Sequence, residues 1–199
     1  MSTAAVTAAR PGKVLADLLP ASRAKTADFA KNAALVVGGA ALTGIAAQVA
    51  IPVPGSPVPV TGQTFAALLV GTALGARRGF LALAVYALAG MAGVPWFAEG
   101  GSGMASASFG YVIGLMLASA AVGALARRGG DRSMLRTAGT FVLGEAIVYA
   151  VGVPYLALST GMGLTAAIAA GLTPFLIGDV LKAALAMGAL PTAWKFADK

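Results

Sequence analysis

The chain has 199 residues, of which 58% are hydrophobic and only 11% are charged, and its mean hydropathy is +0.85. In soluble domains about a quarter of all residues are charged, so this chain could not cover a water-exposed surface with polar groups. It has no cysteine and no histidine, which excludes disulfides, thiol nucleophiles and the common zinc ligand sets. We therefore expect an all-α integral membrane protein that binds no metal.

The first 29 residues form the only polar stretch of any length and predict a cytoplasmic N-terminal tail before a membrane domain of residues 30–199. The apolar part of this stretch, 14–19, is too short for a signal-peptide core, and Pro20 interrupts it. We expect a flexible tail, with a partly helical segment at the lipid surface as the alternative.

Six apolar segments follow and predict six transmembrane helices. They are 31–51, 63–74, 80–94, 109–126, 135–158 and 173–194. The second segment has only 12 residues, so it needs tilt or local membrane thinning to cross. We expect charge-free loops at 52–62, which has four prolines, and at 159–172, and a glycine-rich loop at 95–103.

The basic residues indicate the orientation. With six spans, the N-terminal tail, the Arg77–Arg78 turn, the 127–136 loop and the C-terminus share one side of the membrane. Thirteen of the fourteen Lys and Arg residues lie on this side, with Lys31 at the edge of the first span, and the exception is Lys182. The positive-inside rule makes this side, with both termini, cytoplasmic. The net charge of +7 is therefore a topology signal, and we expect no nucleic-acid partner.

Small residues recur every four positions along the first predicted helix, at Ala30, Ala34 and Gly38 and again at Ala40 and Gly44. Such spacing lets another helix approach closely. Packing within the chain and packing against a partner protein both explain the pattern.

Asp179 and Lys182 lie inside the last apolar segment, three residues apart and so on one face of a helix. A charge within a membrane is costly and faces a partner, a cavity or a ligand. Counting about 1.5 Å per residue from 173, both groups lie in the outer half of the membrane. They are the first candidates for a binding site, although they could also simply neutralise each other.

Other polar and aromatic groups are predicted to share the outer half of the protein. These are Gln63, Trp96, Phe97, Glu99 and Tyr149, with Glu145 one turn deeper than Tyr149. An ammonium can hold a carboxylate, acidic and amide side chains suit amide or ureido groups, and aromatic rings supply flat apolar walls. The set predicts a small ligand, anionic at one end and amide-like at the other. Alternatively, Glu145 pairs with Lys182 structurally, and Trp96 is an interfacial anchor.

No catalytic motif is present. The chain lacks a GxxxxGK[ST] phosphate loop, and a Ser or Thr nucleophile would find no histidine as base. We expect no enzyme activity, so ATP-driven uptake would require another subunit to hydrolyse the ATP.

Five separated motifs stand out along the chain: PVTGQTFA at 59–66, GARRG at 75–79, GMAGVPWFA at 90–98, IVYAVGVP at 147–154 and GDVLK at 178–182. Together they resemble the motifs of the BioY family, the biotin-specific substrate-binding subunits of energy-coupling factor transporters. The resemblance covers residues 33–190 in order. It departs from the family at SASFGY, 106–111, where a proline-containing turn is usual, and at Glu99, where an uncharged residue is common.

The resemblance implies a six-helix plasma-membrane subunit that takes biotin from outside and works with a transmembrane coupling subunit and two cytoplasmic ATPases. It assigns Asp179 and Lys182 to the biotin pocket, and Gln63, Trp96 and Tyr149 to its walls. Ala34 and Gly38 would face the coupling subunit. Two other functions stay open from the residues: binding of a different vitamin, and a self-sufficient carrier in which Glu145, Asp179 and Lys182 form an ion path.

Overall fold

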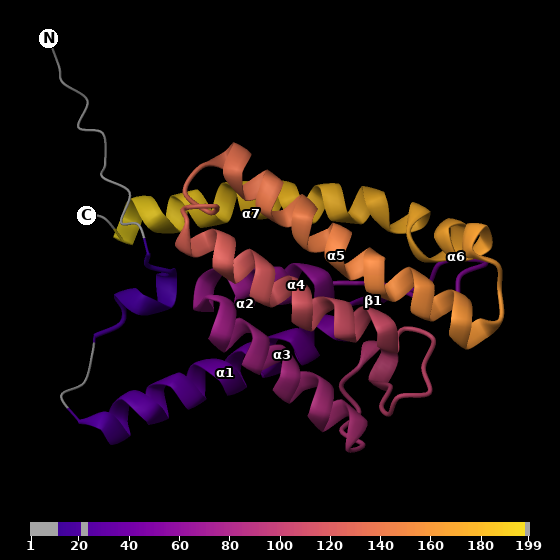
Figure 1. Cartoon of the computed structure of the whole chain (residues 1–199), viewed down its shortest axis with the longest axis horizontal. Helices are drawn as coiled ribbons and strands as arrows, with labels where there is room; N and C mark the ends of the chain where they lie inside the picture. Colours follow the sequence, from indigo (N-terminus) through magenta and orange to yellow (C-terminus); the bar gives the residue numbers. More distant parts are fainter. Residues whose placement is uncertain (1–11, 21–23, 198–199) are drawn as a thin grey trace, which may run out of the picture.

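A computed structural model describes residues 12–20 and 24–197 and shows a bundle of α-helices (Figure 1). The helices are α1 (Lys25–Ala47), α2 (Gln63–Leu74), α3 (Ala76–Met91), α4 (Phe109–Arg127), α5 (Met134–Thr160), α6 (Leu164–Gly171) and α7 (Leu176–Ala197). Short 3-10 turns occupy η1 (Leu15–Leu18), η2 (Ala98–Gly100) and η3 (Thr173–Phe175). Strands β1 (Ala50–Ile51) and β2 (Val60–Thr61) pair antiparallel and close the loop after α1.

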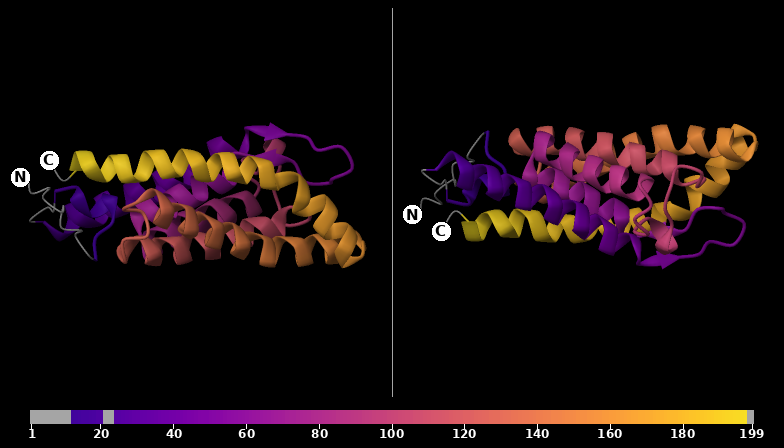
Figure 2. Two further views of the ribbon diagram at one scale, coloured as in Figure 1. Left: turned by 90° about the horizontal axis from the view of Figure 1, so that it is seen from above. Right: turned by 90° about the horizontal axis from the view of Figure 1, so that it is seen from below.

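The segment with η1 and the C-terminal end of α7 lie at one end of the bundle, and the β1–β2 loop and α6 lie at the other (Figure 2). Helices α1, α4 and α5 and the α6–α7 segment are long and apolar enough to cross a membrane, whereas α2 has 12 residues. The six predicted crossings correspond to α1, α2, α3, α4, α5 and α7, which confirms the all-α membrane fold. The short α2 is largely buried, so its neighbours shield it from lipid.

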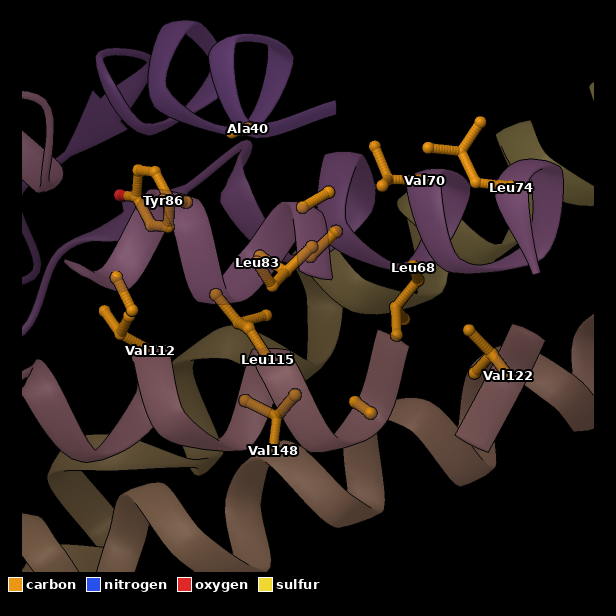
Figure 3. Packing of buried hydrophobic residues seen from close by; sticks show 14 of the residues in the cluster. Ala40, Leu68, Val70, Leu74, Leu83, Tyr86, Val112, Leu115, Val122 and Val148 are labelled. Carbon is orange, nitrogen blue, oxygen red and sulfur yellow. The ribbon is translucent and has the colours of Figure 1, made fainter. Parts of the chain in front are cut away.

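Helix α4 is central because it packs against α2, α3 and α5. Its glycines permit these close crossings: a Cβ on Gly114 would lie 2.9 Å from the backbone of Val148 in α5. Leu83 of α3, Leu115 of α4 and Val148 of α5 then meet in the buried core (Figure 3). This tightly packed centre holds the helices that carry the polar groups of the outer end.

The segment 12–20 packs against the cytoplasmic end of the bundle, so the prediction of a flexible tail is wrong for these residues. Val14 is fully buried, and the Gly12 amide donates a hydrogen bond of 2.9 Å to the Arg127 carbonyl. Helix α1 begins at Lys25 instead of 31, and an i,i+3 ion pair of 3.0 Å between Asp28 and Lys31 lies in the added turns. Residues 1–11 and 21–23 of the predicted tail lie outside the described residues.

The prediction of a loop over 159–172 is also wrong. Helix α5 continues to Thr160 and ends at Gly161 in the left-handed conformation (φ 72°) that favours glycine as a helix stop. Helix α6 follows and buries Ala167 and Gly171 against its neighbours. Glycines suggested an irregular loop, but they serve here as a helix stop and as a close contact, since a Cβ on Gly171 would collide with the Tyr111 hydroxyl.

Candidate ligand-binding site

A cavity lies at the outer end of the bundle, opposite the C-terminal end of α7. It lies between the N-terminal parts of α2, α4 and α7 and the outer half of α5, and two loops reach over it. Its polar lining residues are Thr61, Gln63, Thr64, Ser108, Tyr111, Tyr149, Asp179 and Lys182. Its apolar lining residues are Val58, Pro59, Phe97, Ala98, Val112, Leu115, Val148 and Phe175. A mostly apolar cavity with a few converging polar groups is the usual form of a small-molecule site.

A chain of hydrogen bonds connects three helices along the cavity wall. The Tyr149 hydroxyl of α5 donates to Asp179 of α7, and Lys182 Nζ lies 3.2 Å from the other Asp179 carboxylate oxygen. Lys182 Nζ also donates to Thr64 Oγ1 of α2 at 2.6 Å. The side chains of Lys182 and Asp179 are only 13% and 10% exposed, so the pair is held in a nearly water-free wall where its charges interact strongly.

Gln63 is the first residue of α2 and is also buried in the cavity wall. Its side-chain amide donates a hydrogen bond of 3.0 Å to the Tyr86 hydroxyl, which in turn donates to the Trp96 carbonyl at 3.2 Å. This network ties the start of α2 to the loop after α3.

Phe97 lines the cavity, whereas Trp96 and Glu99 are not among the residues that line it. The Trp96 ring lies behind the cavity, against Gly44 of α1 and the Tyr86 ring, and its indole N–H donates to the Tyr86 carbonyl at 3.0 Å. Glu99 is exposed in a left-handed turn (φ 58°) that turns its side chain to the surface. The structure therefore does not bring these two predicted residues to the site.

Glu145 lies one turn before Tyr149 on α5 and is buried, with 9% of its surface exposed. Among the described residues, neither of its carboxylate oxygens has a hydrogen-bond partner, and Lys182 pairs with Asp179 instead. Glu145 does not line the cavity. The predicted direct pairing of Glu145 with Lys182 is therefore not formed in this structure.

Sequence reasoning missed four polar residues of the cavity wall, which are Thr61, Thr64, Ser108 and Tyr111. Thr64 accepts from Lys182, and its position beside Gln63 in the PVTGQTFA motif was the available signal. The Tyr111 hydroxyl donates to the Gly171 carbonyl at 2.8 Å, and its ring stacks on Phe175 with centroids 6.5 Å apart. No spacing in the sequence indicates that α4 and the α6–α7 connection meet there.

The predicted interface residues Ala34 and Gly38 lie on the exposed face of α1. A Cβ built on Gly38 would meet no atom within 4 Å, so this face is open to a neighbour. By contrast, Gly44 is covered by the Trp96 ring. The two stripes of small residues on α1 thus face different surroundings, one outside the bundle and one inside it.

Comparison with known proteins defines the family. The family model described as "BioY family" matches residues 17–199. The chain is 33% identical to "Probable biotin transporter BioY" of Pyrococcus horikoshii over 79% of this chain and 93% of that protein. It is 35% identical to "Biotin transporter BioY2" of Lactococcus lactis subsp. cremoris over 76% of this chain and 83% of that protein.

A solved structure shares the fold. It is the crystal structure at 2.1 Å of the S-component for biotin from an ECF-type ABC transporter, with a TM-score of 0.76 and 20% identity. The match covers 86% of this chain and 95% of that one. The fold is thus that of a multi-pass membrane subunit. The chain belongs to the BioY family.

Proposed function

We propose that this chain is the biotin-binding S component of an energy-coupling factor transporter and captures biotin from the extracellular side for uptake. The main support for this proposal is the buried Asp179–Lys182 pair in the wall of the outer cavity, in a chain whose relatives are named biotin transporters. The mechanism is capture and release, with no covalent chemistry on this chain and no cofactor bound to it.

The chemistry of the cavity suits biotin. Biotin carries a carboxylate on an aliphatic chain and, at its other end, a ureido ring with two N–H donors and a carbonyl acceptor. Lys182 Nζ offers a charge-assisted hydrogen bond to the ligand carboxylate, while Asp179 accepts from the ureido N–H groups. In the reverse assignment, Lys182 donates to the ureido carbonyl. Phe97, Tyr111 and Phe175 supply aromatic walls for the apolar part of the ligand.

Two loops act as the lid in this proposal. Val58 and Pro59 come from the β1–β2 loop, and Phe97 and Ala98 come from the loop after α3, and all four line the cavity. The β1–β2 loop is charge-free and rich in proline, which restricts its backbone and lowers the entropy lost when it closes. We propose that these loops exclude water from the bound ligand.

Uptake requires partners that hydrolyse ATP. We propose a transmembrane coupling subunit and two cytoplasmic ATPases, and we propose that the exposed face of α1 with Ala34 and Gly38 contacts the coupling subunit. Small residues on an exposed transmembrane face support this assignment, because they allow a second helix to approach closely.

Biotin binding to the purified protein in detergent tests the proposal by isothermal titration calorimetry. Asp179→Asn and Lys182→Ala each remove one charge of a buried pair, so each is expected to weaken biotin binding about 100-fold or more. Glu99→Gln is the matched control: it also removes one charge near the outer end, but from an exposed side chain outside the cavity. Near-normal affinity in both cavity variants would overturn the site.

A competition measurement tests the identity of the ligand independently of the position of the site. Riboflavin and thiamine should fail to displace biotin, since neither carries a carboxylate opposite a ureido ring. If the cavity variants abolish binding of another vitamin while biotin never binds, the site stands and the assignment of biotin fails.

A further inference from the structure

A groove opens on the cytoplasmic half of the protein, and we call it the arginine groove. Three arginines line it, Arg77 and Arg78 at the start of α3 and Arg127 at the end of α4, together with Asn32 of α1. Leu74, Ala76 and Leu81 form its apolar lining. The groove lies at the end of the bundle opposite the ligand cavity, and the function proposed above makes no use of it.

The charges of the groove are only partly neutralised within the chain. Asp17 pairs with Arg78 at 2.8 Å and with Arg127 at 3.3 Å, so one carboxylate serves two guanidinium groups. Arg77 is exposed and has no side-chain hydrogen bond or ion pair among the described residues. The groove therefore presents an excess of positive charge at the cytoplasmic boundary of the membrane.

An exposed apolar track continues from Arg77 along α3. Leu81, Val85 and Leu88 follow at helical spacing on the same face and are 50%, 36% and 62% exposed. A second hollow adjoins the groove and combines Arg77 with Phe80 and Leu81. A cationic head followed by an apolar track toward the membrane interior matches the shape of a phospholipid, with an anionic headgroup above an acyl chain.

We propose that the arginine groove binds an anionic phospholipid of the cytoplasmic leaflet. Its phosphate contacts the guanidinium of Arg77 at the mouth of the groove, and one acyl chain lies along Leu81, Val85 and Leu88. Basic pockets between helices on the cytoplasmic side are where anionic headgroups bind, because the positive charge and the adjoining apolar surface act together. The apolar track favours a lipid over a soluble protein segment, since the track runs into the depth of the membrane.

Native mass spectrometry of the full chain, released from vesicles of equal parts phosphatidylglycerol and phosphatidylcholine, tests the proposal. The wild type should retain phosphatidylglycerol about fivefold over phosphatidylcholine, and Arg77→Gln should abolish that preference, in line with the attraction of one basic residue for an anionic surface. Arg128→Gln is the matched control, because it removes the same charge from an exposed cytoplasmic residue that does not line the groove. Its lipid preference should equal that of the wild type.

Three outcomes would overturn the proposal. Equal loss of preference in Arg77→Gln and Arg128→Gln would mean that the attraction is a diffuse surface effect. Displacement of the bound lipid by millimolar inorganic phosphate would make the groove a site for free anions. Unchanged lipid retention in Arg77→Gln, with weaker co-purification of the coupling subunit, would make it a protein-docking site.

Discussion

The two ends of the bundle use buried charges in different ways. At the outer end, Asp179 and Lys182 pair within one helix at i,i+3, and both face a cavity. At the cytoplasmic end, charged groups join segments that are far apart in the chain: Asp17 contacts Arg78, 61 residues away. Charges at the cytoplasmic end therefore join distant segments directly, whereas the two outer charges pair with each other and contact α5 and α2 only through the hydroxyls of Tyr149 and Thr64.

The cluster around Trp194 shows how far the cytoplasmic network extends. The indole N–H of Trp194 in α7 donates to the fully buried Asp131 at 2.7 Å. Arg132 lies over the Trp194 ring with its guanidinium carbon 3.2 Å from the centroid, and it also donates to the Lys13 carbonyl at 2.8 Å. One cluster thus connects α7, the α4–α5 loop and the N-terminal segment.

The largest expected effect is on stability at the cytoplasmic end. Asp131→Ala leaves the buried Trp194 N–H without its acceptor and removes the carboxylate beside Arg132, so the free energy of unfolding should fall by about 3 kcal/mol. Thermal unfolding in detergent measures the change, and the biotin affinity of the folded fraction should stay at the wild-type value. A stability equal to that of the wild type would contradict the structural role of this end.

The second prediction removes both charges of the outer pair together. Asp179→Asn combined with Lys182→Met leaves no unpaired buried charge, and replacing a buried pair by neutral groups is often nearly neutral for stability. The unfolding temperature should therefore change little, while biotin binding falls at least about 100-fold. If the double variant unfolds as easily as Asp131→Ala, the contrast between the two ends is wrong.

The third prediction uses pH to test the Asp17 network. Burial favours the neutral form of Asp17, but hydrogen bonds from Arg78 and the Val14 amide, with the charges of Arg127 and Arg78, outweigh it and lower the pKa of this carboxyl. A lowered folded pKa contributes stability that is complete above the unfolded value of about 3.9 and is lost as the pH falls through the folded pKa.

Asp17→Asn removes this contribution, so the variant should be about 1 kcal/mol less stable than the wild type at pH 6. The difference in unfolding temperature should shrink as the pH is lowered below 4, because the wild-type carboxyl then also becomes neutral. A difference that stays constant from pH 6 to pH 3 would show that the charge of Asp17 has no role.

The sequence predicted the features that depend on membrane physics. Apolar segments and the distribution of Lys and Arg gave the all-α fold and the six crossings, because the membrane imposes length and charge rules along the chain. The length and charge rules failed for segments rich in glycine or polar residues, because contacts with distant parts of the chain determine the structure of these segments. The helix α6 and the packed segment 12–20 are both stabilised by such contacts, through Tyr111 and Arg127 respectively.

The candidate site was likewise predicted only in part from the sequence. Asp179, Lys182, Tyr149, Gln63 and Phe97 were predicted from depth and from the family resemblance, and the structure brings them to one cavity. Trp96 and Glu99 are neighbours of Phe97 in sequence, but the direction of each side chain in an irregular loop depends on local dihedral angles that no periodicity reveals. Their roles could not be separated without the structure.

The smallest expected effect is the loss of one hydrogen bond to the Asp179–Lys182 pair, and it is compared with the loss of a hydrogen bond outside the cavity. Tyr149→Phe removes only the hydroxyl that donates to Asp179, so biotin affinity should fall about fivefold, which corresponds to the loss of one hydrogen bond. The ring remains to pack in the cavity wall, and the unfolding temperature should change little. Tyr155→Phe is the matched control, since that hydroxyl donates to the Met104 carbonyl at 3.0 Å outside the cavity. A loss of affinity in both variants would mean that the effect is not specific to the cavity, and a loss in neither would mean that orientation of Asp179 by Tyr149 does not contribute to binding.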